Sequence, residues 1–191
     1  MSKQVKTVHR KKRKTYNIKG HAHELTFSCY HQYNYLNDPR SCELFLDELS
    51  TARKQYNFYL WAYVLMPNHV HLLLYPYKEH YNISIILQSI KGKMSTNYRN
   101  FLVKNNPTLF KKMCIQTGKR KVFRFWQVGG GYDRNLWTAK AVHASIKYVE
   151  ANPVRKELVK RPEDWKWSSA RAREYQEGLM PDDFDIPFLM K

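Results

Sequence analysis

Two histidines that flank a single valine, His69 and His71, follow a predicted tight turn over Met66–His69. Proline and asparagine suit the central positions of such a turn, and apolar segments on either side favour two strands. Residues two apart in a strand share a face, so both imidazoles point one way, while Val70 and the leucines alternating with it point the other. Two adjacent imidazoles form half of a metal site. The alternative, two partly exposed histidines on an edge strand, stays open.

A tyrosine and an asparagine one helical turn apart, Tyr148 and Asn152, form a second polar pair. The pattern predicts a helix over 138–151, capped by Thr138 and ended by Asn152-Pro153. Its apolar stripe is Val142, Ile146 and Val149, and the small residues beside Tyr148 on the adjoining face are Ala141, Ala144 and Ser145. Small neighbours leave space over the tyrosine ring. A buried tyrosine with a hydrogen-bonded hydroxyl is the alternative.

Two other groups compete for these roles. His21-Ala-His23 repeats the histidine spacing, but it lies where a basic arm meets the first strand and lacks the long apolar context. Tyr132 is the rival nucleophile, but it follows a glycine run and has no amide one helical turn later. We therefore rank both behind the first assignments.

The charge of the chain indicates a polyanionic partner. Its 191 residues include 33 Lys and Arg against 16 Asp and Glu, a formal net charge of +17. Such an excess opposes compaction unless an anion is a habitual partner, and nucleic acid is the usual one. An anionic membrane is the competing explanation. No apolar run has transmembrane length and no predicted helix has one strongly basic face, so we expect no membrane partner.

The three cysteines, Cys29, Cys42 and Cys114, lie far apart and form no CxxC pair. A zinc ribbon or a disulfide framework is therefore not expected. The first residues lack the charged-then-apolar pattern of a signal peptide. We expect a reduced, intracellular protein.

The predicted elements form an α+β fold. Strands are expected at 23–30, in a hairpin from about 56 to 76, and at 122–127, and helices at 41–52 (capped by Ser41), 84–103 and 138–151. This order predicts a ferredoxin-like antiparallel sheet with helices on one face. We expect a basic N-terminal arm at 1–19, with the run His9–Lys14, a main domain at 20–155 and a C-terminal tail at 156–191 packed on that domain.

Basic and aromatic residues outside the predicted core could hold DNA through phosphate contacts and base stacking. The candidates are Lys91, Lys93, Arg99, Arg120, Lys121, Arg124, Trp126, Tyr132 and Arg134. Lys119 belongs to the same basic run, and Tyr98, Phe125 and Trp137 are further rings that could stack. For each lysine a solvated surface role is the alternative, and for Trp126 and Trp137 a place in the core.

Three segments together resemble one known family: Tyr63–Leu74, Phe123–Asn135 and Ile146–Arg155. In this order they are similar to the REP-associated tyrosine transposases, which belong to the single-tyrosine, His-hydrophobic-His transposases. The pair Leu158-Val159 and the segment Arg161–Ser169 also resemble the tail of that family. The resemblance covers about residues 22 to 173.

The resemblance implies a ferredoxin-like nuclease domain that cuts single-stranded DNA beside a hairpin. It implies that Tyr148 attacks the phosphodiester and keeps the 5′ phosphate as a phosphotyrosine, with His69, His71 and Asn152 as metal ligands. Two imidazoles and an amide oxygen suit an exchangeable Mg²⁺ or Mn²⁺, although imidazoles would also accept zinc. The implied location is the bacterial cytoplasm, associated with the nucleoid, and a monomer is favoured over a homodimer.

Two other functions stay open at this point. A hairpin DNA- or RNA-binding regulator on the same scaffold, without cleavage, fits the charge equally well. A zinc hydrolase acting on small substrates fits the histidines but gives no reason for the net charge of +17.

Overall fold

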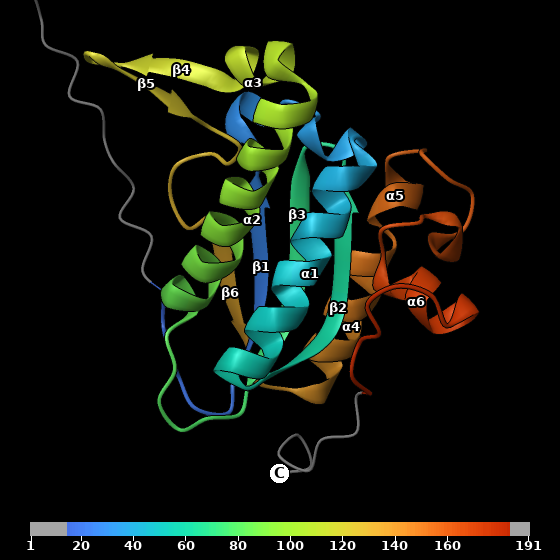
Figure 1. Cartoon of the computed structure of the whole chain (residues 1–191). Helices are drawn as coiled ribbons and strands as arrows, with labels where there is room; N and C mark the ends of the chain where they lie inside the picture. Colours follow the sequence, from blue (N-terminus) through green and yellow to red (C-terminus); the bar gives the residue numbers. More distant parts are fainter. Residues whose placement is uncertain (1–14, 184–191) are drawn as a thin grey trace, which may run out of the picture.

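The structure of the protein is a computed structural model that describes residues 15–183. Its centre is an antiparallel sheet of four strands: β1 (Ala22–Ser28), β2 (Phe58–Met66), β3 (His69–Pro76) and β6 (Tyr132–Leu136). They lie in the order β2-β3-β1-β6, so β1 separates the hairpin from the last strand (Figure 1). This is the strand order of a ferredoxin-like sheet, and the predicted α+β fold with a ferredoxin-like antiparallel sheet is confirmed.

The β2–β3 hairpin orients the two histidines as the sequence predicts. β2 ends at Met66 and β3 begins at His69, which leaves only two residues for the turn. Val70, Leu72 and Leu74 of β3 are buried in the larger core on one face of the sheet. Because side chains alternate along a strand, His69 and His71 project from the opposite face. In the β1–β3 register they lie opposite Ser28 and Thr26 of β1.

Helices α1 (Pro39–Tyr56) and α2 (Ile83–Asn105) cover the face that carries the larger core (Figure 1). Asp38 caps α1 by accepting a hydrogen bond from the backbone N–H of Arg40 at 2.9 Å. The predicted cap, Ser41, is wrong: it lies inside the helix and donates to the Asp38 carbonyl at 2.8 Å. Proline is favoured at the first helical position, so Pro39 starts the helix before Ser41.

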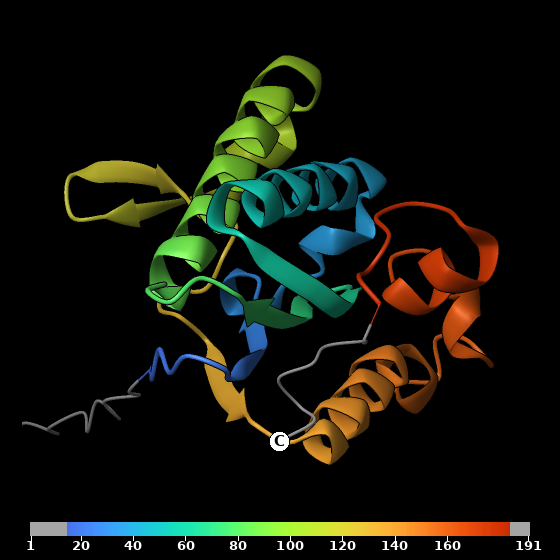
Figure 2. The same ribbon diagram turned by 90° about the horizontal axis from the view of Figure 1, so that it is seen from below.

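Helix α4 (Ala139–Glu150) packs on the other face of the sheet (Figure 2). As predicted, Thr138 caps it and Val142 and Val149 are fully buried. The prediction that the helices share one face is wrong, because β2 and β3 are apolar on both sides. Trp61 and Leu73 belong to a second core on this face, and α4 covers that core.

The segment between α2 and β6 forms a projecting ribbon. Helix α3 (Pro107–Met113) leads into β4 (Cys114–Thr117) and β5 (Arg120–Phe123), which pair only with each other (Figure 2). The predicted strand at 122–127 is therefore wrong beyond Phe123. Phe125 and Trp126 instead turn into the larger core, which their large apolar surfaces favour. The fourth strand of the sheet is β6, whose polar residues gave no apolar alternation to recognise.

The C-terminal segment covers the outer edge of β2. Short helices α5 (Asn152–Arg155) and α6 (Ser169–Tyr175) flank the 3-10 helix η3 (Pro162–Asp164). The backbone N–H of Leu65 donates to the Trp167 carbonyl at 2.9 Å, and Trp165 Nε1 donates to the Leu65 carbonyl at 2.9 Å. Pairing of this kind removes an exposed strand edge that could otherwise join another chain.

Smaller features complete the described part of the chain. Two 3-10 helices, η1 (Tyr30–Gln32) and η2 (Tyr35–Asn37), connect β1 to α1. The three cysteines are free. No helix within residues 15–183 is long and apolar enough to cross a membrane. The predicted basic run His9–Lys14 lies outside the described residues.

Candidate active site

The two histidines of β3 bring their ring nitrogens together. Nε2 of His69 lies 3.1 Å from Nε2 of His71. Nδ1 of His71 lies 2.8 Å from the Thr26 hydroxyl, and Nδ1 of His69 lies 2.6 Å from Oδ1 of Asn68. When each Nδ1 donates to its oxygen partner, both Nε2 atoms keep a lone pair, and the two lone pairs converge. This is the arrangement of a two-histidine metal site with oriented ligands.

Burial keeps both imidazoles neutral at pH 7. His71 is 5% exposed, and burial lowers its pKa to about 3, with further lowering from neighbouring His69 and Arg155. Burial, followed by the charge of Lys156, also lowers the pKa of His69. Because a metal binds the neutral form of histidine, both rings are ready to act as ligands without losing a proton.

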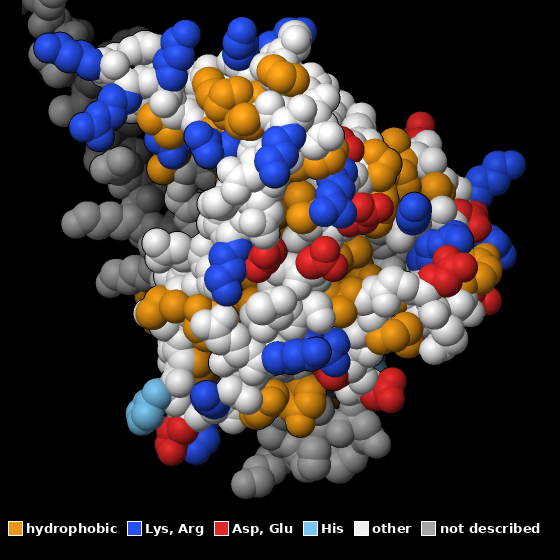
Figure 3. Space-filling model, in the orientation of Figure 1, with side chains coloured by type: hydrophobic (Ala, Val, Ile, Leu, Met, Phe, Trp, Pro, Cys, Tyr) orange, Lys and Arg blue, Asp and Glu red, His pale blue; other side chains and the backbone are white. Residues whose placement is uncertain are grey.

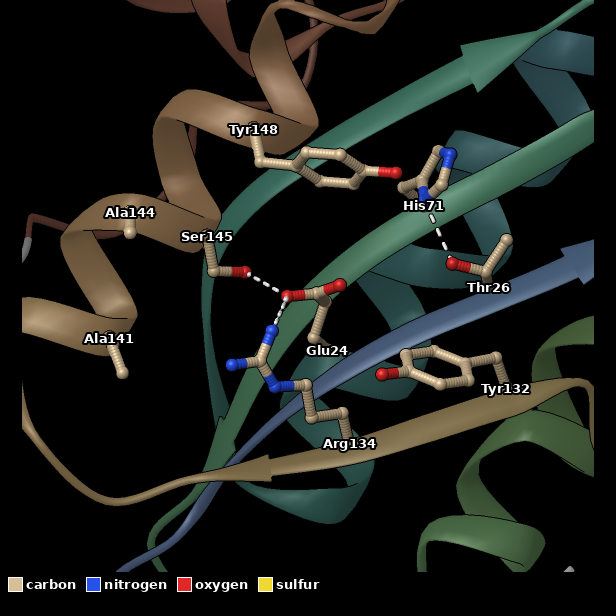
Figure 4. A pocket seen from close by; sticks show the side chains of 9 residues that line it. All are labelled: Glu24, Thr26, His71, Tyr132, Arg134, Ala141, Ala144, Ser145 and Tyr148. Atoms are coloured by element: carbon tan, nitrogen blue, oxygen red, sulfur yellow. Dashed lines mark hydrogen bonds and ion pairs between the residues drawn. The ribbon is translucent and has the colours of Figure 1, made fainter.

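Tyr148 of α4 faces the histidine pair across the sheet surface. Its ring centroid lies 5.9 Å from that of His71, with the two planes perpendicular. The hydroxyl points toward His71 (Figure 4). The ring is 41% exposed, so a substrate can reach it, and the Arg155 guanidinium lies 4.6 Å over it. A tyrosine buried for packing alone would not have this exposure.

A cavity of about 630 Å³ opens beside Tyr148, between α4 and strands β1, β3 and β6. Its lining residues are Glu24, Thr26, His71, Tyr132, Arg134, Ala141, Ala144, Ser145 and Tyr148 (Figure 4). The small residues of α4 leave the open space that the sequence pattern indicates. Tyr132, the rival nucleophile, lies on the far side of the cavity, opposite Thr26 in the β1–β6 register.

Asn152 lies just past the end of α4 and is 6% exposed. Its Nδ2 donates to the backbone carbonyls of Tyr148 at 2.8 Å and Val149 at 3.3 Å. The bond to Tyr148 satisfies a carbonyl group of the last helical turn, while the Val149 carbonyl also accepts from the Ala151 N–H. Asn152 does not line the cavity. Its role as third metal ligand stays a prediction.

Three residues of this site, Glu24, Thr26 and Arg155, are not indicated by the sequence patterns. Glu24 is 7% exposed, accepts a hydrogen bond from the Ser145 hydroxyl at 2.9 Å and lies 3.9 Å from Arg134. Thr26 holds His71, and Arg155 covers Tyr148. Alternation along β1 places Glu24 and Thr26 on one face, but only the strand register shows that this face carries the histidines.

The other DNA-binding candidates are distributed over two regions. Lys91, Arg124 and Trp126 line a second cavity, of about 580 Å³, between α2 and residues 123–130. Arg120 and Lys121 lie on the exposed β5 strand. Lys and Arg side chains gather over this ribbon and the neighbouring end of the molecule (Figure 3).

Several candidates have partners within the protein. Lys91 Nζ donates to the Gly129 carbonyl at 3.0 Å, and burial lowers its pKa. Lys93 donates to Gln55 at 3.4 Å, and the Arg99 guanidinium lies 5.7 Å from the Phe110 ring. Trp126 is 7% exposed and packs against two core phenylalanines, which favours the core alternative.

The remaining aromatic candidates divide between core and surface. Tyr98 and Phe125 are each 1% exposed and belong to the larger core, so they present no ring surface to DNA. Trp137 is 65% exposed and lies 5.5 Å from the His21 ring. His23, the other histidine of the competing pair, is buried and bonds to Asp133 and Tyr81, each at 2.8 Å. Both ring nitrogens of His23 are therefore occupied by partners within the protein.

Solved structures and a family model match this chain. A solved REP-associated tyrosine transposase bound to a REP hairpin matches with a TM-score of 0.68 at 18% identity, over 94% of this chain and 96% of that one. A candidate transposase from Deinococcus radiodurans R1 matches with a TM-score of 0.45 at 19% identity, over 71% and 93%. No curated protein matches. The family model described as "Transposase IS200 like" matches residues 7–127, and the chain belongs to this family.

Proposed function

We propose that this chain cuts and rejoins single-stranded DNA beside hairpins through a covalent 5′-phosphotyrosine on Tyr148. One observation carries the proposal: two neutral imidazoles, with Nε2 atoms 3.1 Å apart, lie next to an accessible tyrosine from a distant part of the chain. Membership of a transposase family supports DNA as the substrate. The solved relative bound to a REP hairpin supports a hairpin beside the cut.

The reaction consists of two phosphoryl transfers. The Tyr148 oxygen bonds to phosphorus, the bond between phosphorus and the 3′ oxygen breaks, and the phenolic proton is lost while the 3′ oxygen gains one. A different 3′ hydroxyl then attacks the phosphotyrosine and releases the tyrosine. Because each step exchanges one phosphoester for another, rejoining needs no external energy source. Arg155, 4.6 Å over the Tyr148 ring, is placed to offset negative charge at the phosphate.

His69 and His71 would hold a divalent cation, which we propose to be Mg²⁺ or Mn²⁺. The residues fit such an ion: the Nε2 atoms converge, the rings are neutral, and Thr26 and Asn68 orient them. Within residues 15–183, no three His, Cys, Asp or Glu side chains group as a metal site. An amide such as Asn152, the phosphate or water must then complete the shell. When bound, the cation would polarise the phosphate oxygens.

DNA would be held by the basic surface beyond the cavity. Arg120 and Lys121 on the β4–β5 ribbon are exposed, and Lys91 and Arg124 line the second cavity. Phosphate contacts of this kind supply affinity without sequence preference. Because His71 and Tyr148 come together within one chain, a monomer would suffice for cleavage.

The test is a covalent trapping experiment. The protein is incubated with hairpin-bearing single-stranded DNA and Mn²⁺, and the denatured mixture is examined for a protein–DNA adduct. We expect an adduct with the wild-type protein and with Tyr132→Phe, and none with Tyr148→Phe. His71→Ala should strongly reduce its rate of formation.

Two outcomes would contradict the proposal. An adduct undiminished in Tyr148→Phe would mean that another residue is the nucleophile. Tight, salt-dependent hairpin binding without any adduct, and unchanged in His71→Ala, would instead identify a regulator that binds without cutting.

A further inference from the structure

The cavity beside Tyr148 has two ends of different character. The histidine end lies close to a cation, since the Arg155 guanidinium lies 4.6 Å over the Tyr148 ring, whose hydroxyl points toward His71 (Figure 4). The opposite end contains a carboxylate, Glu24 of β1. Glu24 lies 3.9 Å from Arg134, which lines the same cavity, so this end has no excess of positive charge to attract a phosphodiester. A phosphodiester, which is negatively charged, therefore belongs at the first end.

Glu24 presents one free oxygen to the open space. Its Oε2 accepts from the Ser145 hydroxyl at 2.9 Å and lies 3.9 Å from Nη1 of Arg134. The other carboxylate oxygen points away from both partners, into the cavity (Figure 4). The side chain is only 7% exposed. A carboxylate oxygen that faces a cavity can accept from a donor of a bound molecule in place of the water that otherwise solvates it.

The roles already assigned at this site do not use Glu24. It does not complete a metal site, because no group of three His, Cys, Asp or Glu side chains in the described range could hold an ion. The Tyr148 hydroxyl points toward His71, away from the carboxylate (Figure 4). A carboxylate oxygen only accepts hydrogen bonds, so the group that lies beside Glu24 in the complex must carry a donor.

An unpaired nucleobase has this chemistry, and the surroundings of Glu24 suit one. Arg134 stands directly opposite Glu24 in the β1–β6 register and lines the same cavity. Tyr132 supplies a half-exposed ring, and Ala141 and Ala144 supply a shallow wall. Thr26, which holds His71, is two residues from Glu24, about 7 Å along the strand. The base site therefore adjoins the phosphate site.

We propose that Glu24 reads an unpaired base next to the phosphate that Tyr148 attacks, and that guanine fits best. This inference rests on the proposed cleavage of single-stranded DNA. Guanine presents two adjacent donors, N1–H and the N2 amino group, either of which can donate to the free oxygen of Glu24, while its O6 and N7 accept from an arginine such as Arg134. Thymine presents a single ring N–H between two carbonyls, which the carboxylate would repel.

The experiment varies the base on each side of the mapped cleavage position and measures the initial rate of adduct formation. A good bidentate contact discriminates by on the order of tenfold to a hundredfold. We expect the wild-type protein to prefer guanine over thymine by at least about tenfold at one of the two positions. Replacing that guanine by hypoxanthine, which lacks the N2 amino group, should remove much of the advantage.

Two variants separate base reading from a structural role. Glu24→Gln keeps the shape but loses the charge, and we expect its rates for the four bases to converge. Ser145→Ala removes the bond from α4 to Glu24 and leaves the carboxylate, so it should keep the guanine preference. The hypoxanthine substrate tests the same contact on the wild-type protein if Glu24→Gln does not fold.

The outcomes are distinct from those of the proposed function. Equal rates for all four bases, or a guanine preference retained in Glu24→Gln, would overturn the base site while leaving Tyr148-dependent cleavage intact. If no substrate gives an adduct, the proposed function fails and the base site fails with it.

Discussion

Protonation of His71 should make the fold acid-sensitive. Burial lowers the pKa of this imidazole from 6.5 to about 3, so the folded protein stays unprotonated there in mild acid. The unfolded chain takes up the proton near pH 6.5. It therefore binds more protons between these values, and stability is lost as the pH falls from about 6.5 toward 3. Each pH unit in that window costs up to about 1.4 kcal/mol, or about 2 kcal/mol between pH 7 and pH 5.

Urea unfolding in the presence of EDTA measures this effect. The free energy of unfolding is determined at pH 7 and pH 5 for the wild-type protein and for His71→Gln, which does not titrate at this position. Titration of most other groups is common to both proteins and cancels. The loss between the two pH values should be larger in the wild type by about 2 kcal/mol. Equal losses would refute the conclusion that this imidazole is buried in its neutral form.

Three further predictions concern the parts around the site. Thr26→Val removes the hydroxyl 2.8 Å from the imidazole of His71, the proposed metal ligand, and we expect the affinity for Mn²⁺, followed by calorimetry, to fall about 10- to 100-fold. Gly131→Ala would place a Cβ 2.1 Å from the Thr26 carbonyl at φ +83°, and we expect a loss of at least about 2 kcal/mol in urea unfolding. Arg120→Ala with Lys121→Ala should reduce the slope of log K for hairpin binding against log salt by about two, because two phosphate contacts are lost.

Each of these predictions has a matched control. Thr26→Ser keeps a hydroxyl and should restore most of the Mn²⁺ affinity. Gly130→Ala has nothing within 4 Å of the added Cβ and should be nearly neutral, so a similar loss there would show that the close approach is not the cause. Lys54→Ala, on α1 and away from both cavities, should leave the salt slope unchanged.

The half of the site that lies on regular elements could be predicted from the sequence. Alternation in β3 put His69 and His71 on one side, and the helical period of α4 separated its buried valines from Tyr148. Both predictions use a short repeat that a single element imposes on its own residues. They need no knowledge of which elements are neighbours.

The other half depends on tertiary contacts that no local repeat encodes. Glu24 is a lone acid in an apolar strand, and its place in the cavity follows from pairing between β1, β3 and β6. Strand β6 itself is polar, so it lacks the apolar alternation by which strands are recognised. Phe125 and Trp126 gave a strand-like pattern because they fill the core from an irregular segment. The missed strand β6 and the wrongly predicted strand beyond Phe123 have one cause: the sequence prediction takes apolar residues as the sign of a strand.

The position of Tyr148 relative to His71 follows from the same burial that folds α4. Val142 and Val149 are fully buried against the sheet, and Ser145 bonds to Glu24 on the strand below. A helix turns by about 100° per residue, so slipping α4 by one residue would expose both valines and break that bond. Burying a valine is worth roughly 1.5 to 3 kcal/mol, so the two together oppose this slip by several kcal/mol. The tyrosine is thus held in position without itself being buried, which leaves its hydroxyl accessible to a phosphate.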